Sequence, residues 1–158
     1  MLREFAGWYT GKTSPVHVFW HSFDLALTRF SGRRAPALPD ADEVTREAYS
    51  HEAISFGFWA GDAQVRRPAF YSYPAPEPAG LTERPLAEGA TWVSTGSSSQ
   101  AILPYDDVRT AADPRAVLLA FLQSAYEAGV DAAGWPAEEL NSGWAPPRGG
   151  ALTSRSES

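Results

Sequence analysis

The sequence contains no cysteine, a single lysine and no long hydrophobic run. Without cysteine the chain has no disulfide, no thiolate nucleophile and no zinc site of the cysteine-containing structural kind. No window holds the roughly 18 consecutive apolar residues that a membrane-spanning helix requires, and the first residues lack the apolar stretch of a signal peptide. These absences predict a cytoplasmic protein with no membrane partner.

The chain also lacks an excess of positive charge. Its 19 acidic and 13 basic residues give a net charge of −6 at pH 7, and the resulting field repels a phosphate backbone. A P-loop, a dinucleotide-binding glycine fingerprint and a G-x-S-x-G elbow are absent as well. We therefore expect no nucleic-acid partner and no cofactor.

What is present is an ordinary globular composition. Hydrophobic residues make up 44% and charged residues 20% of the 158 residues, which predicts one folded domain with one core. That domain is expected to span residues 1–145. The last residues, 146–158, offer almost nothing to bury and are expected to form a disordered tail.

A helix is expected near the C-terminus, over 113–133. Asp113 is placed to cap it, Pro114 suits its first turn, and Gly134 and Pro136 end it. Alternating apolar residues predict strands around 51–61, 69–73, 91–93 and 101–105, and the prolines at 74, 76 and 78 make the second of these an edge or terminating strand. Strands followed by a helix indicate an α+β domain, an antiparallel sheet of four or five strands packed against a C-terminal helix.

The segment 14–33 fits two templates. As a helix it would begin at Ser14 and end at Gly32. As a strand it would place His17, His21 and Leu27 on one face and Asp24 on the other. Its content of Val, Phe and Trp favours the strand.

Four longer strings in the sequence carry a family resemblance. They are GKTSPVHVFWHSFDLALTRFSGRRAP, REAYSHEAISFGFWAGD, FYSYPAPEPAGL and LPYDDVR. In order and spacing the chain from about Gly11 to Trp135 resembles the bacterial, mainly actinobacterial, domain-of-unknown-function family 5996. The resemblance implies the C-terminal half of a longer pattern, and so a missing N-terminal half, another protein or self-association as partner. It implies no reaction and no site residues.

Three residues could form a metal or acid–base site if segment 14–33 were helical. His17, His21 and Asp24 would then share one face, whereas in a strand the two histidines lie roughly 13 Å apart. A metal site is accordingly not expected. His51 and Glu52 form a second polar cluster. In a strand these adjacent residues would point to opposite faces, and this separation favours a structural role.

The remaining candidates are ligand-binding residues. Arg29, Tyr71 and Tyr73 could line one pocket with the histidines, Arg33 could hold an anion through paired donors, and Trp20 belongs to an aromatic run that could stack a planar ligand. The sequence does not decide whether the protein is an enzyme. A non-catalytic small-molecule- or protein-binding module is the preferred interpretation, and the alternative is a small hydrolase dependent on histidine and carboxylate, with or without a metal.

Overall fold

The computed structural model describes residues 1–36, 43, 47, 50–63 and 66–141. In chain order its elements are α1 (Leu2–Gly7), β1 (His17–Phe19), β2 (Asp24–Arg34), β3 (His51–Trp59), β4 (Ala69–Ala75), the 3-10 turn η1 (Leu81–Glu83), β5 (Thr91–Thr95), β6 (Ser98–Pro104), α3 (Tyr105–Arg109), α4 (Pro114–Ala133) and α5 (Ala137–Leu140). The predicted α+β class and antiparallel sheet are confirmed. None of the described helices is long and apolar enough to cross a membrane.

The sheet has six strands in the order β1-β2-β3-β4-β6-β5, all neighbours antiparallel. The predicted count of four or five is therefore slightly low. The extra strand arises because segment 14–33 is not one strand but a hairpin, in which β1 and β2 are joined by a turn over 20–23. The strand interpretation was right, but the chain reversal at the turn was not foreseen.

Strand β4 corrects the expectation that 69–73 forms an edge. It lies in the middle of the sheet, between β3 and β6. Its ladder with β6 ends at Ser72, whereas its ladder with β3 continues through Pro74. Pro74 thus occupies the part of the strand that has one neighbour, where a missing N–H is tolerated.

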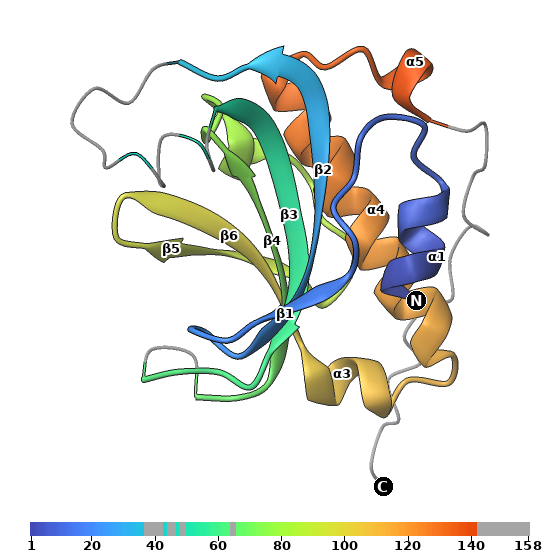
Figure 1. Ribbon diagram of the computed structural model, residues 1–158. Coiled ribbons are helices and arrows are strands. Elements are labelled where there is room, and N and C mark those ends of the chain that lie inside the picture. The colour runs from blue at the N-terminus through green and yellow to red at the C-terminus, as the bar shows by residue number, and fades with distance from the viewer. Residues whose placement is uncertain (37–42, 44–46, 48–49, 64–65, 142–158) are drawn as a thin grey trace, which may run out of the picture.

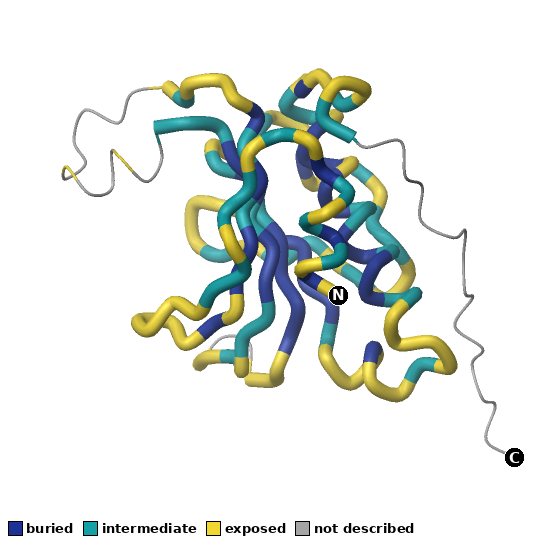
Figure 2. The backbone as a smooth tube through the Cα atoms, turned by 45° about the vertical axis from the view of Figure 1, so that its right-hand side comes forward, coloured by how far each residue is buried: buried dark blue, intermediate teal, exposed yellow. Residues whose placement is uncertain are grey.

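The helices α1 and α4 lie together on one side of the sheet, to its right in Figure 1, and no described α-helix lies on the other side. Helix α4 begins as predicted, with the Asp113 carboxylate accepting a hydrogen bond from the Ala116 N–H at 3.0 Å, and it ends at Gly134, which adopts the left-handed conformation. The largest cluster of buried side chains fills the space between the helices and the sheet, and Figure 2 shows the corresponding buried stretches on the central strands and α4.

The predicted tail, 146–158, lies outside the described residues. The described residues thus form one sheet with a helical layer on one face. The candidate site lies on the opposite face of the sheet.

Candidate functional site

The face of the sheet opposite α4 is built by side chains that alternate with the core positions of each strand. Ala26, Gly57 and Tyr71 are direct neighbours on β2, β3 and β4. Opposed residues in an antiparallel ladder point to the same face, as do residues two apart in one strand. Asp24 and Tyr73 therefore share this face with them.

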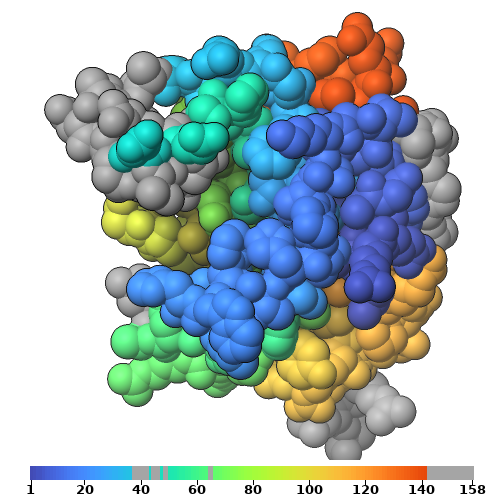
Figure 3. Space-filling view, viewed as in Figure 1, coloured from blue at the N-terminus to red at the C-terminus, as the bar shows by residue number. Residues whose placement is uncertain are grey.

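A pocket of about 510 Å³ opens on this face. Its described lining comes from the β1–β2 turn, the start of β2, the end of β3 with the loop after it, β4 and the β5–β6 hairpin. These residues are His21, Ser22, Asp24, Trp59, Gly61, Asp62, Tyr71, Tyr73, Thr95 and Gln100. In the space-filling view the surface is hollowed between the yellow β5–β6 hairpin and the blue and green segments below it (Figure 3). Its volume is that of a site for a small organic ligand.

Asp24 is the buried acid of this pocket. Only 6% of the residue is exposed, and its two carboxylate oxygens accept hydrogen bonds from the hydroxyls of Ser22 and Tyr71. None of the described basic side chains forms an ion pair with it. The carboxylate is thus held in place by neutral donors alone.

Burial, followed by the hydrogen bond to Asp24, raises the pKa of the Tyr71 phenol well above its ordinary value of 10.0. Both causes disfavour the phenolate, the first by desolvation and the second because the neutral hydroxyl is the donor. Tyr71 consequently remains a protonated donor to Asp24 across the physiological pH range.

Aromatic rings form the wall beside the acid. Tyr71 and Tyr73 are stacked with their centroids 6.0 Å apart and an interplanar angle of 19°, and Trp59 packs on Tyr71 at 5.3 Å. The hydroxyl of Thr95 and the amide of Gln100 add polar groups across the pocket. A flat apolar surface next to a fixed acceptor can hold a planar molecule that carries hydrogen-bond donors.

Gly57 explains how a tyrosine on β4 reaches an acid on β2. A methyl group at this position would overlap the phenol end of the Tyr71 ring and the carbonyl oxygen of Leu25. The ring therefore crosses β3 in the space that the missing side chain leaves. The sequence analysis missed Gly57, although a glycine between two phenylalanines inside a strand is a signal of close approach.

The β1–β2 turn carries His21 and Ser22 to the pocket rim. Phe23 has a positive φ of 54°, and its N–H donates to the Phe19 carbonyl at 2.7 Å. Trp20, at the tip, is 84% exposed and does not line the pocket. A bulky residue in the left-handed region is strained, and here the strained turn places Ser22 against Asp24.

The histidines of the hydrolase hypothesis do not come together. His17 opposes Ala26 and His51 opposes Arg34 on the same strand, so eight residues, or roughly 26 Å, separate their positions. His17 donates through Nδ1 to the Pro15 carbonyl at 2.8 Å, and the His51 ring bonds the Ser50 hydroxyl at 3.0 Å. Among the described residues no group of three histidine or acidic side chains could hold a metal.

The hairpin also changes which residues share a face. His17 lies beside Ala26, on the face that carries Asp24, rather than opposite to it as a single strand would require. His21 and Asp24 both line the pocket, whereas His17 does not.

Arg29 lies on the helical side, away from Tyr71 and Tyr73. It is 1% exposed and its guanidinium stacks 3.6 Å from the Phe5 ring centroid and 4.6 Å from that of Tyr126. It also donates to the Phe5 carbonyl. Burial lowers its pKa to about 10, partly offset by Tyr126 and Tyr9, so the group stays charged at neutral pH and belongs to the core.

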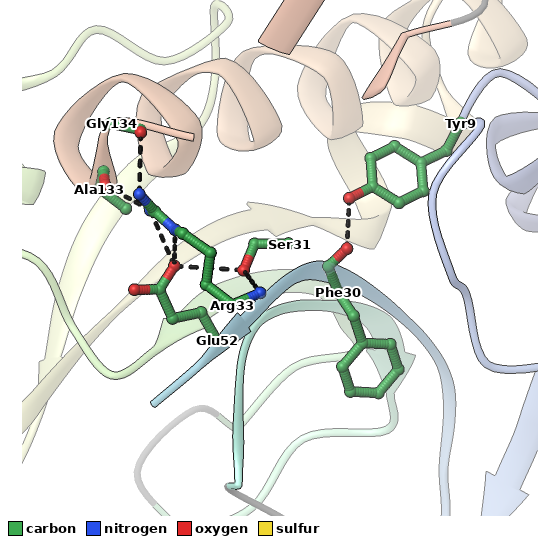
Figure 4. A network of polar contacts seen from close by, with 7 residues as sticks. All are labelled: Tyr9, Phe30, Ser31, Arg33, Glu52, Ala133 and Gly134. Atoms are coloured by element: carbon green, nitrogen blue, oxygen red, sulfur yellow. Dashed lines mark hydrogen bonds and ion pairs between the residues drawn. The ribbon is translucent and has the colours of Figure 1, made fainter. Parts of the chain in front are cut away.

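Arg33 and Glu52 form an ion pair that connects β2 and β3 to the end of α4. Arg33 pairs with Glu52 at 2.8 Å and donates to the carbonyls of Ala133 and Gly134 at 2.8 and 3.2 Å. Figure 4 shows this network, with the Ser31 hydroxyl donating to Glu52 at 3.2 Å, next to the bond from Tyr9 to the Phe30 carbonyl. Among the described residues, Glu52 thus pairs with Arg33 and accepts from Ser31, and Arg33 also holds the helix end.

Comparison with known proteins gives a family and no activity. Neither the search of curated proteins nor the search of solved structures found a match. A family profile described as a family of unknown function, DUF5996, matches residues 1–142. The resemblance noted in the sequence is thereby confirmed at the level of the family, and the chain belongs to the family of unknown function DUF5996.

Proposed function

We propose that this protein is a small-molecule-binding module whose site is the pocket around Asp24, Tyr71 and Tyr73. The single observation that carries the proposal is a carboxylate held almost fully buried at the wall of a 510 Å³ pocket, fixed by two hydroxyl donors. Burying a charge is costly, and a fold whose only task is stability gains little from doing so on a face that no described helix covers. A ligand that binds to the carboxylate would explain why it is buried here.

The surroundings of the acid support binding more than catalysis. Hydrolysis needs a general base or a nucleophile near the reacting atom. The two histidines nominated for that role, His17 on β1 and His51 on β3, pair with positions near opposite ends of β2. The hydroxyls next to Asp24 donate to it. Tyr71 is held in its protonated form by burial, which raises its pKa, so it is a poor base or nucleophile.

The second preferred class, a module that binds a protein partner, uses the same face. The partners expected from the family resemblance, another protein or a second copy of the chain, stay predictions, and a partner docked on this face would cover the pocket. A partner chain and a small molecule would then compete for this face.

The experiment is a fragment screen by ligand-observed NMR, repeated on two tryptophan variants. Thr95 lines the pocket, whereas Ser94, the preceding residue of β5, points to the other face of the sheet and is exposed. Thr95→Trp should fill the pocket and abolish binding of the hits. Ser94→Trp, the matched control, should bind them as the wild type does.

Two results would contradict the proposal. Fragments that bind Thr95→Trp and wild type equally well must occupy another site. A screen without any fragment that distinguishes the two variants would remove the pocket as a ligand site.

A further inference from the structure

We infer that the ligand of this pocket carries a planar, positively charged nitrogen group, such as an amidinium, a guanidinium or a protonated heteroaromatic ring, and that Asp24 is its anchor. The inference rests on the proposed function, because it names the ligand class of the same site. Three independent features of the pocket support it.

The first feature is the sign of the charge. Among the described residues, the lining contains two acids, Asp24 and Asp62, no arginine or lysine, and one histidine, His21. A cleft lined by one sign of charge concentrates ions of the opposite sign. The pocket therefore attracts a cation and repels a carboxylate or phosphate.

The second feature is the acceptor capacity of Asp24. An ionised carboxylate offers about four lone-pair sites, and the two hydroxyls of Ser22 and Tyr71 engage one oxygen each. Ion pairs between described residues involve Glu4, Glu52, Asp106 and Asp131, and none of these pairs includes Asp24. Asp24 thus combines a nearly complete loss of water with unused capacity for charged donors.

The third feature is the aromatic wall. A cation over the face of Trp or Tyr is attracted by the ring quadrupole, and the attraction strengthens when water is excluded. Tyr71 and Tyr73 are within 19° of parallel, and Trp59 adjoins Tyr71. A flat cation can stack on these rings while its N–H groups meet the carboxylate in the paired geometry that planar donors favour.

The test compares three probes of nearly the same shape: benzamidinium, the neutral benzamide and the anionic benzoate. Binding is followed by amide chemical shifts in 1H–15N spectra, with dissociation constants from titration. We expect benzamidinium to shift residues of the pocket and to bind about tenfold or more tighter than benzamide, the ratio that one additional charge pair near a protein surface supplies. Benzoate should leave the pocket residues unshifted.

Three variants assign the preference to the acid. Asp24→Asn keeps the shape but removes the charge, and should bind benzamidinium and benzamide equally. Ser22→Ala removes one of the two donors that fix Asp24 and keeps the charge, so it should still bind benzamidinium more tightly than benzamide. Asp106→Asn, which changes an exposed acid paired with Arg109 outside the pocket, should behave as wild type. If Asp24→Asn fails to fold, the ratio of benzamidinium to benzamide affinity in the wild type still tests the inference.

Distinct results overturn distinct claims. If benzamide or benzoate binds at the pocket residues as tightly as benzamidinium, the cation inference is wrong while the binding site stands. If benzamidinium shifts no pocket residue at millimolar concentration, the cation inference is also wrong, and the comparison of Thr95→Trp with Ser94→Trp decides the pocket separately.

Discussion

At the scale of single residues, the site depends on a glycine, Gly57, whose lack of a side chain leaves space for a neighbouring ring. Gly57 sits on β3 between Ala26 and Tyr71, and its missing side chain lets the Tyr71 ring lie across the strand. Interior strand glycines are unfavourable for stability because they give up packing and chain entropy. The fold accepts this cost where the phenol must reach Asp24.

We predict that Gly57→Ala displaces the Tyr71 ring, breaks its hydrogen bond to Asp24 and lowers the free energy of unfolding by roughly 1–3 kcal/mol, the usual cost of overpacking. Urea denaturation measures the loss, and the fragments that bind the wild type should bind the variant more weakly. Gly7→Ala is the matched control, because Gly7 has no heavy atom within 4 Å of an added methyl group. A Gly57→Ala protein as stable as Gly7→Ala would show that the ring does not need the space.

Arg29 shows where a residue-level prediction misjudged the environment. A guanidinium in a sequence is expected at a surface or in a ligand site, because it is rarely buried without a carboxylate. Here Phe5, Tyr9 and Tyr126 surround it with π faces, and the Phe5 carbonyl accepts one of its hydrogen bonds. The rings come from α1, the segment after it and α4, so no local pattern around residue 29 could reveal the cage.

At the scale of elements, the end of α4 is joined to β2 by one arginine. The last carbonyls of a helix lack intrahelical partners and carry the negative end of its dipole. The Arg33 guanidinium donates to two of them while pairing with Glu52. This contact ties the helical layer to the sheet at a point far along the chain.

Replacing this residue tests that tie. Arg33→Ala should lower the free energy of unfolding by about 1 kcal/mol, since the side chain is 43% exposed and a partly solvated ion pair with a helix end contributes on that order. The loss should shrink at high salt, because screening already weakens the pair. Arg34→Ala removes the same charge from the exposed neighbouring residue and should cost less. Equal losses for the two variants would mean that only net charge matters.

Elements with local signals could be predicted, and those set by distant pairing could not. Asp113, Pro114 and Gly134 mark the ends of α4 within a few residues of its own sequence. Strand β4 was misplaced because the sequence does not show that β6 pairs with it only as far as Ser72. Asp24 was a candidate, but for a site shared with histidines. Its actual partners, Ser22 in the turn and Tyr71 two strands away, depend on the hairpin and on the strand order.

At the scale of the whole molecule, both faces of the sheet bury tyrosine hydroxyls. Tyr9 and Tyr126 lie on the helical side and Tyr71 on the pocket side, and burial is the first cause that raises the pKa of each above 10.0. Half of the six tyrosines thus resist ionisation in the folded state. The titration of the protein at high pH reports on both layers at once.

Above about pH 10 an unfolded tyrosine loses its proton while a buried one keeps it, so the folded state binds more protons and stability falls as pH rises. Each tyrosine contributes about 1.4 kcal/mol per pH unit. The lowered pKa of Arg29 acts in the opposite sense, since its unfolded form keeps a proton that the folded form releases above about pH 10, but three tyrosines outweigh one arginine. Urea denaturation should therefore show that the free energy of unfolding declines steeply above pH 10. The phenolate absorbance of these three tyrosines should appear only when the protein unfolds.

Tyr126→Phe separates this effect from general alkaline damage. Its hydroxyl is buried without a hydrogen-bond partner in the described structure, and such a group costs stability, so the variant should be at least as stable as wild type at pH 7. The variant should also lack the one proton that Tyr126 keeps in the folded state and releases on unfolding. The decline in the free energy of unfolding above pH 10 should therefore be shallower by about 1.4 kcal/mol per pH unit. If the decline is as steep as in wild type, Tyr126 ionises as readily folded as unfolded, and the core around Arg29 must admit water.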